Sequence, residues 1–270
     1  MSIASYAKIN LHLEVIGKLP NNYHQVNTVF CSIDLCDFLS LEVTNSSEIS
    51  FYCSDSSLEG QDNLVYKMAF FLQSQYQITK GVRIQLQKNI PVAAGLGGGS
   101  SNAACCLEQL NKLWQLSLSE VDLHKIAAMF GSDVNFFLVG GTALGTNRGE
   151  LITPLPRLDI KNILLVNPGL KISSKEAYGL VKVPDRETQR HFNPQSWKTS
   201  CFNRLESGIR EVYPLIGQII CTLNEQGAKP AMMSGSGSTC FGVFSELGNL
   251  EYCKKLFDSQ GFWTYVARTK

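Results

Sequence analysis

The stretch PVAAGLGGGSSN at residues 91–102 constrains the fold more than any other part of the sequence. It places four glycines within the five positions from Gly95 to Gly99. Glycine loses more backbone entropy on ordering than any other residue, so such a run weakens a fold unless something offsets the loss. The run therefore predicts a place where the backbone itself must be approached closely.

The flanking residues predict that this run joins a strand to a helix. Residues 82–86 alternate between apolar and polar side chains, and apolar residues at helical spacing follow from Ala103, so a helix is expected to begin at Ser100 or Ser101. A glycine turn at a helix start is suited to anions, because backbone N–H groups can approach phosphate oxygens. The spacing matches neither G-x-x-x-x-G-K-[ST] nor G-x-G-x-x-G. A purely structural glycine turn is the alternative.

A second glycine-rich stretch, MSGSGST at residues 233–239, lies between two short apolar segments. By itself it is typical of a hairpin turn. Two loops able to hold anions in one chain suit a protein that binds phosphate groups from two sides.

The first half of the chain predicts alternating strands and helices. We expect strands over residues 9–15, 26–35 and 82–86, a helix capped by Asp62, a helix from about Ser119 to Phe130 that ends at Gly131, and a short segment VNFFLV capped by Ser132-Asp133. Lys8 and Asn10 share parity on the first strand, so both side chains should project from the same face.

The pattern changes beyond about residue 150. A strand over residues 162–166, a long helix over 202–225, strands over 231–233 and 240–244, a helix over 250–257 and a strand over 263–267 give the order β-α-β-β-α-β of a ferredoxin-like domain. Pro154 and Pro156 mark a seam at residues 151–159. We therefore expect an N-terminal domain of residues 1–150 and a C-terminal domain of residues 151–270, with an irregular polar insertion at residues 184–198.

Composition narrows the class of protein. The formal net charge is +1, which argues against a nucleic-acid or anionic-membrane surface, and no apolar segment is long enough to span a bilayer. The beginning, MSIASYAKIN, does not have the pattern of a signal peptide, so a cytoplasmic protein is expected. The nine cysteines and four histidines show no metal-ligand spacing, so we expect buried free thiols and no structural metal.

Three segments together resemble a known family. AKINLHLEVIGKLPNNYHQVNTVF, PVAAGLGGGSSNAA and MMSGSGSTCFGVF, in this order and at this separation, resemble the superfamily of small-molecule kinases that includes galactokinase, homoserine kinase and mevalonate kinase. The likeness runs nearly from end to end. Tyr23-His24 and the form of the glycine loop narrow it to the members that act on a cytidine diphosphate-linked methylerythritol.

The resemblance implies both a fold and a reaction. The fold class would be α+β, a two-domain small-molecule kinase with an N-terminal domain like ribosomal protein S5 domain 2 and a ferredoxin-like C-terminal domain. ATP with Mg²⁺ would phosphorylate the 2-hydroxyl of the acceptor in non-mevalonate isoprenoid biosynthesis. The partners would be these small molecules alone, with no nucleic acid and no membrane, and the protein would be a monomer or a weak homodimer.

The resemblance also assigns the ATP site. Backbone donors of the loop would hold the phosphates, the Ser101 hydroxyl could reach Mg²⁺, and two residues would lie near the adenine. The residues concerned are Asn63, Lys88, Pro91, Gly95, Leu96, Gly97, Gly98, Gly99, Ser100, Ser101 and Asn102.

Two residues would carry the chemistry. The motif GSDVNFF places Asp133 at the family's catalytic base, which would accept the proton of the attacking hydroxyl. Lys8 matches the family's strand lysine, which would lie near Asp133 and offset the negative charge of the transferred phosphoryl group. Without the resemblance, Asp133 is better interpreted as a helix cap and Lys8 as a lysine snorkelling from a strand end.

The acceptor would be held by a third set of residues. Asn10 would contact the methylerythritol hydroxyls, Tyr23 and Tyr178 would form aromatic walls for the cytosine, and His24 would read its edge. Gly235, Ser236 and Gly237 would approach the diphosphate.

One position departs from the family pattern. Arg204 stands where the family usually has an acid in Asn-Asp-Leu-Glu, which puts any role of that acid in doubt. The alternatives are another kinase of the same superfamily, which has no need of Tyr23-His24, and a nonenzymatic nucleotide-binding protein that kept the loop.

Overall fold

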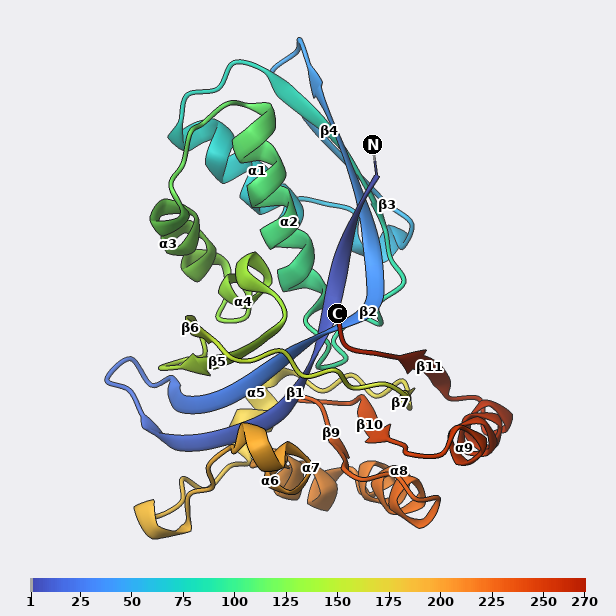
Figure 1. Ribbon diagram of the computed structural model, residues 1–270. Helices are drawn as coiled ribbons and strands as arrows, with labels where there is room; N and C mark the ends of the chain where they lie inside the picture. Colours follow the sequence, from blue (N-terminus) through green and yellow to red (C-terminus); the bar gives the residue numbers. More distant parts are fainter. Residues whose placement is uncertain (1) are drawn as a thin grey trace. The chain divides into compact units, whose positions relative to one another are not determined.

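A computed structural model describes residues 2–270, which form two compact units (Figure 1). Unit 1 comprises residues 2–7, Leu35–Val92 and Gly97–Val139; unit 2 comprises Lys8–Asp34, Ala93–Leu96 and Gly140–Lys270. The chain passes from one unit to the other within the long strands β1 (Ser2–Lys18) and β2 (His24–Thr44). The units are therefore interleaved in sequence and differ from the domains expected at residues 1–150 and 151–270. That family division stays a prediction.

Unit 1 is a small sheet with helices packed on it. The end of β2 pairs antiparallel with β4 (Gly81–Gln87), and β4 pairs parallel with β3 (Ile49–Cys53). The helices are α1 (Leu64–Gln75), α2 (Gly98–Leu113), α3 (Glu120–Phe130) and α4 (Val134–Val139), with a short 3₁₀ turn at Ser56–Leu58. Their apolar faces and those of the strands form one buried core, in which Met68, Ile84 and Leu107 are fully enclosed.

The ends of helices α1 and α3 in unit 1 can be compared with the predicted helix boundaries. Ser119 caps α3 through a bond from the Asp122 amide, and Gly131 ends it, as expected. The cap of α1 is Asn63, not Asp62: the Asn63 Oδ1 accepts the Val65 amide at 2.9 Å. Asn63 lies two residues before Val65, so its side chain can reach the Val65 amide, whereas the Asp62 side chain extends into solvent.

Unit 2 contains the expected ferredoxin-like order. Its four-stranded sheet has the order β11-β7-β10-β9, with neighbouring strands antiparallel. The strands are β7 (Ile163–Asn167), β9 (Ala231–Met233), β10 (Cys240–Val243) and β11 (Trp263–Ala267). The helices α8 (Pro214–Glu225) and α9 (Leu247–Ser259) complete the β-α-β-β-α-β sequence and contribute to the core of this unit.

The prediction of one long helix over residues 202–225 is wrong. Phe202–Asn203 form a short strand, β8, which pairs parallel with β1, and two helices follow, α7 (Glu206–Val212) and α8. Pro214 starts α8, where its missing N–H costs no helical bond. The apolar spacing of this region is continuous along the sequence, but the proline divides it.

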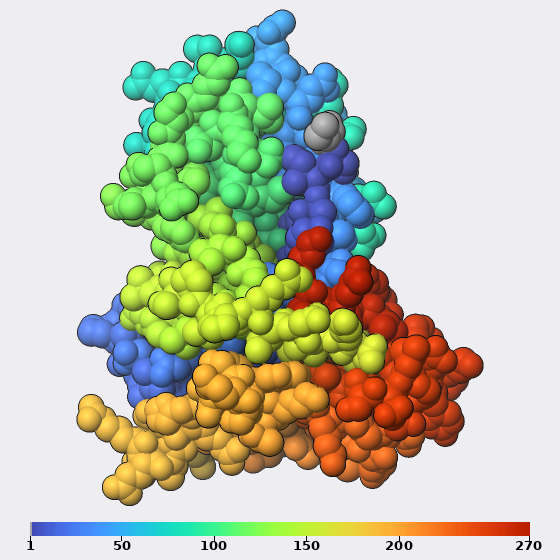
Figure 2. Space-filling model, viewed as in Figure 1, coloured from blue at the N-terminus to red at the C-terminus, as the bar shows by residue number. Residues whose placement is uncertain are grey.

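The rest of unit 2 includes the end of β1 and the beginning of β2 with their neighbours. β5 (Thr142–Thr146) pairs with β2, β6 (Leu151–Pro154) pairs with β5, and α5 (Ser174–Gly179) follows β7. The expected insertion consists of 3₁₀ turns at Arg186–Thr188 and Pro194–Ser196 and the short helix α6 (Trp197–Ser200), and it lies on the surface of the unit (Figure 2). Among residues 2–270, no helix combines the length and apolarity needed to cross a bilayer.

Candidate active site

The glycine run opens α2 in the way an anion site requires. Gly97 is the N-cap, with a left-handed φ of 72°, and α2 begins at Gly98, slightly earlier than expected. The Ser101 amide donates to the Gly97 carbonyl at 2.9 Å, and the amides before it have no acceptor inside the helix. A Cβ on Gly98 would lie 3.0 Å from the Ile90 side chain and 3.1 Å from the Lys88 Nζ, so both side chains pack closely under the helix start.

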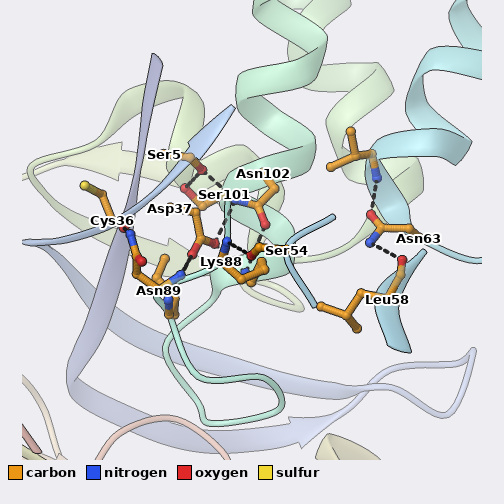
Figure 3. Close-up of polar contacts among 12 residues, drawn as sticks. Ser5, Cys36, Asp37, Ser54, Leu58, Asn63, Lys88, Asn89, Ser101 and Asn102 are labelled. Atoms are coloured by element: carbon orange, nitrogen blue, oxygen red, sulfur yellow. Dashed lines mark hydrogen bonds and ion pairs between the residues drawn. The ribbon is translucent and has the colours of Figure 1, made fainter. Parts of the chain in front are cut away.

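A buried carboxylate, Asp37, organises the residues beneath this helix start (Figure 3). Its Oδ1 accepts the backbone amides of Asn89 at 2.7 Å and Ile90 at 2.9 Å. Its Oδ2 forms an ion pair with Lys88 Nζ and accepts the Asn102 Nδ2 at 3.0 Å. Four donors thus compensate the buried charge, as a desolvated carboxylate requires. Asp37 could not be predicted as part of the site, because an aspartate within a strand pattern has no local signal of its role.

We expect Asp37→Ala to lower the free energy of unfolding by about 3–5 kcal/mol, because it leaves the nearly buried Lys88 ammonium without its counterion. Urea denaturation measures the effect. Asp62→Ala is the control, since Asp62 pairs with Lys67 at the surface of the same unit and its loss should leave stability nearly unchanged. Equal stability of the two variants would contradict the role of Asp37.

Several other residues assigned to ATP are engaged in contacts within the protein. The Lys88 ammonium also contacts Asn102 Oδ1 at 3.1 Å, so it is bonded inside the protein (Figure 3). The Asn63 side chain caps α1 and donates to the Leu58 carbonyl at 3.1 Å. Pro91 is half-buried and Leu96 is buried. Contact of these residues with ATP stays a prediction.

Ser101 does not fit a magnesium ligand. Its residue is 3% exposed, and its hydroxyl lies 2.7 Å from that of Ser5 inside the same network. No group of three or more His, Cys, Asp or Glu residues within 2–270 could hold a metal ion.

In unit 2, Lys8 on β1 is buried, and its side chain reaches the Gly95 carbonyl. Its Nζ donates to the Asn10 Oδ1 at 2.6 Å and to the Gly95 carbonyl at 3.0 Å, and it lies 5.5 Å from the centre of the Phe30 ring. The Asn10 Nδ2 in turn donates to Thr28 at 2.7 Å. Lys8 and Asn10 do point to the same side of β1, as their parity predicts. These contacts fix the position of the Lys8 side chain.

The second glycine loop reaches the same lysine. Gly235 has a φ of 55°, and a Cβ built there would lie 3.0 Å from the Asn10 Oδ1 and 3.2 Å from the Lys8 Nζ. The Ser234 hydroxyl donates to the Gly95 carbonyl at 3.1 Å. The Gly237 amide closes the turn on the Ser234 carbonyl at 2.9 Å, so it is occupied, whereas the amides of Gly235 and Ser236 take no part in that closure.

Two of the residues assigned to the base, Tyr23 and His24, lie where the chain turns from the end of β1 into the beginning of β2. His24 and Tyr178 stack at 5.2 Å between ring centres, and Tyr23 is 55% exposed with the Arg148 guanidinium 5.2 Å from its ring centre. Burial, and then the charge of Lys18, lower the pKa of His24. The His24 Nε2 is buried and finds no hydrogen-bond partner among residues 2–270. An orphaned polar atom of this kind is suited to a ligand.

Arg204 has a defined place in this structure. Its guanidinium forms two bonds of 2.7 Å with the buried carboxylate of Glu14 on β1. Burial raises the pKa of Glu14, but the bonds from Arg204 and from the backbone outweigh it and hold that pKa below its ordinary value. The cation at position 204 is therefore paired with an acid of this chain.

Asp133 lies directly before α4 in unit 1, and its carbonyl accepts the Phe136 amide at 3.2 Å. Lys8 belongs to unit 2. Their cooperation in the reaction stays a prediction.

Comparisons with known proteins identify relatives along the whole chain. The family model "GHMP kinases N terminal domain" matches residues 63–141, and "GHMP kinases C terminal" matches residues 184–251. A 4-diphosphocytidyl-2-C-methyl-D-erythritol kinase of Caldanaerobacter subterraneus subsp. tengcongensis is 37% identical and covers 100% of this chain and 96% of its own. The kinase of that name from Geobacillus kaustophilus is 40% identical, over 90% of this chain and 88% of its own.

Solved structures agree with this. A crystal structure of 4-(cytidine 5'-diphospho)-2C-methyl-D-erythritol kinase is 29% identical, with a TM-score of 0.85 over 100% of this chain and 98% of its own. The mevalonate kinase of Methanococcus jannaschii, 13% identical, has a TM-score of 0.73 over 100% of this chain and 98% of its own, and so shares the fold. The expected two-domain small-molecule kinase fold is confirmed.

Proposed function

The chain belongs to the family of 4-diphosphocytidyl-2-C-methyl-D-erythritol kinases, and on this premise we propose that it transfers the γ-phosphoryl group of ATP to the 2-hydroxyl of that cytidine diphosphate-linked polyol. One structural observation supports the proposal independently of the similarity to known kinases. The buried Lys8 ammonium is held by Asn10 and by the Gly95 carbonyl, next to a second glycine loop. This is a fixed cation beside two backbone segments able to receive phosphates.

Phosphoryl transfer demands mainly positioning and neutralisation of charge. The nucleotide phosphates would lie at the first turn of α2, and Mg²⁺ would enter as part of the Mg·ATP substrate. Asp133 would take the proton of the acceptor hydroxyl, and Lys8 would offset the charge on the transferred oxygens. Asn10 would orient the polyol, and the amides of Gly235 and Ser236 would face its diphosphate.

The assay that tests the proposal measures ADP release with Mg·ATP. The acceptors offered are the cytidine diphosphate-linked methylerythritol, mevalonate, homoserine and galactose. We expect turnover with the first alone. Turnover with another acceptor instead would overturn the assignment of the substrate, and ATP binding without any turnover would favour a nonenzymatic protein.

We expect Tyr23→Ala to raise the KM for the acceptor about 10-fold or more, because stacking on an aromatic ring contributes about 1–3 kcal/mol per base. The KM for ATP should stay nearly unchanged. Initial-rate kinetics with each substrate varied separate the two constants. Tyr252→Ala, at an equally exposed tyrosine on α9, is the control. An unchanged acceptor KM would remove Tyr23 from the base site.

We propose further that the protein acts in the cytoplasm as a monomer or weak homodimer. The small-molecule substrates and the nearly neutral charge support the first part of this proposal, since neither calls for a membrane or nucleic acid. Sedimentation of the purified protein over a range of concentrations measures the oligomeric state.

A further inference from the structure

Asn203 is the second residue of β8, and its side chain contacts the second glycine loop. It is 5% exposed, and its Nδ2 donates to two carbonyls of the second glycine loop, those of Met233 and Gly235, at 2.8 Å each. Its Oδ1 accepts the Leu205 amide at 3.0 Å. Both donors of the amide group are therefore used on the loop, while its acceptor ties it to the start of α7.

Bonds to the carbonyls of Met233 and Gly235 fix both ends of a three-residue segment. Glu206, three residues after Asn203, accepts the Met233 amide on its Oε2 at 3.0 Å and so holds the same segment from α7. Ser234, between the two bonded carbonyls, accepts the Asn10 amide at 3.3 Å. The side chains of Asn203 and Glu206, which lie outside the loop, and the backbone of Asn10 thus hold the path of this segment.

This path places the loop against the lysine. Gly235 comes so close to Asn10 and Lys8 that a side chain there would contact both. A loop displaced by a fraction of an ångström would shift its amides relative to the Lys8 ammonium, and misplacement of about 1 Å costs about 10²-fold in rate.

We propose that Asn203 is a positioning residue of the kinase reaction, which holds the Met233–Gly235 backbone in register with Lys8 and Asn10 so that the loop can receive the acceptor's diphosphate. The proposal rests on the proposed function for its substrate. Asn203 touches no reacting atom; it acts through the carbonyls that it binds.

The neighbouring residue offers a matched control. Arg204 bonds to Glu14 and to the Thr188 carbonyl, and no bond joins its side chain to the glycine loop among residues 2–270. Arg204→Gln removes a buried ion pair beside Asn203 and should reduce stability without moving the loop. This variant therefore distinguishes a loss of protein stability from a displacement of the glycine loop.

The decisive variant is Asn203→Asp. It keeps the shape and the acceptor for Leu205 but turns an oxygen toward the two carbonyls. We expect kcat/KM for the acceptor at pH 8 to fall about 30-fold, the loss that two unmade buried hydrogen bonds imply, with the KM for ATP unchanged. Protonation of this carboxyl restores one O–H donor, so the ratio of variant to wild-type activity should rise as the pH falls toward 5.5. Asn203→Ala has no such group and should show no rise.

Hydrogen exchange provides a readout that does not depend on turnover. Amides of residues 233–239 should exchange faster in Asn203→Asp than in wild type and in Arg204→Gln, with α8 unchanged. Equal loop protection in all three proteins, a similar loss of kcat/KM in Arg204→Gln, or the absence of recovery at low pH would each overturn the proposal. A wild-type protein inactive on the acceptor would refute the proposed function, and the exchange data would still decide whether Asn203 holds the loop.

Discussion

Replacement of Asp133 by asparagine is expected to lower kcat by about 10²–10⁴-fold, the contribution of a positioned general base. The asparagine has nearly the same shape but does not accept the proton of the attacking hydroxyl. The backbone bond from Phe136 to position 133 at the start of α4 is independent of the side chain, so the local fold should persist. Steady-state kinetics and a direct ATP-binding titration measure the two effects, and ATP affinity should remain within about twofold.

Asp62→Asn is the control for this variant, since Asp62 is an exposed aspartate of the same unit that forms a surface ion pair with Lys67. It should leave kcat unchanged. A kcat for Asp133→Asn close to that of Asp62→Asn would remove Asp133 from the role of base.

Gly95→Ala is the second variant with a large expected effect. Gly95 has a φ of 75°, and a Cβ there would fall well inside the van der Waals radius of the Ser234 carbonyl oxygen and 3.0 Å from the Gly237 amide nitrogen. Both neighbours are backbone of the second glycine loop, so relief requires that loop to move. We expect the free energy of unfolding to fall by about 2 kcal/mol or more and kcat/KM to fall by about 10²-fold.

Urea denaturation and initial rates measure the two effects of Gly95→Ala. Gly248→Ala is the control: the position lies in α9, and a Cβ there meets nothing within 4 Å. Alanine should be neutral or slightly stabilising at that helical position. Wild-type stability and rate for Gly95→Ala would show that the two glycine loops are not packed as closely as the structure has them.

Periodicity predicted most of the fold correctly. The strands at residues 82–86, 231–233 and 263–267 and the helix ended by Gly131 were confirmed nearly to the residue, because an alternating or helical apolar pattern reflects which faces are buried. The long helix over 202–225 failed because Phe202–Asn203 pair with β1, a partner distant in sequence. Local spacing contains no information on such a pairing.

Some residues of the candidate site could likewise be predicted from the sequence, and others could not. The glycine loops and the shared parity of Lys8 and Asn10 could be predicted, since each is a property of a short stretch of chain. Asp37 and Asn203 were missed, because their importance comes from donors and carbonyls supplied by other elements: Lys88 and Asn102 for Asp37, Met233 and Gly235 for Asn203. The same holds for Arg204, an anomaly in the sequence that Glu14 compensates.

The sequence by itself determined where the backbone must be free of side chains and which faces of the strands and helices are buried. Both follow from glycine content and hydrophobic periodicity, which are properties of short stretches of chain. Only the tertiary structure decided how the buried charges are satisfied and how the second glycine loop is held at Lys8. A buried carboxylate, amide or ammonium needs partners at hydrogen-bond distance, and the folded chain supplies them from strands and helices remote in sequence.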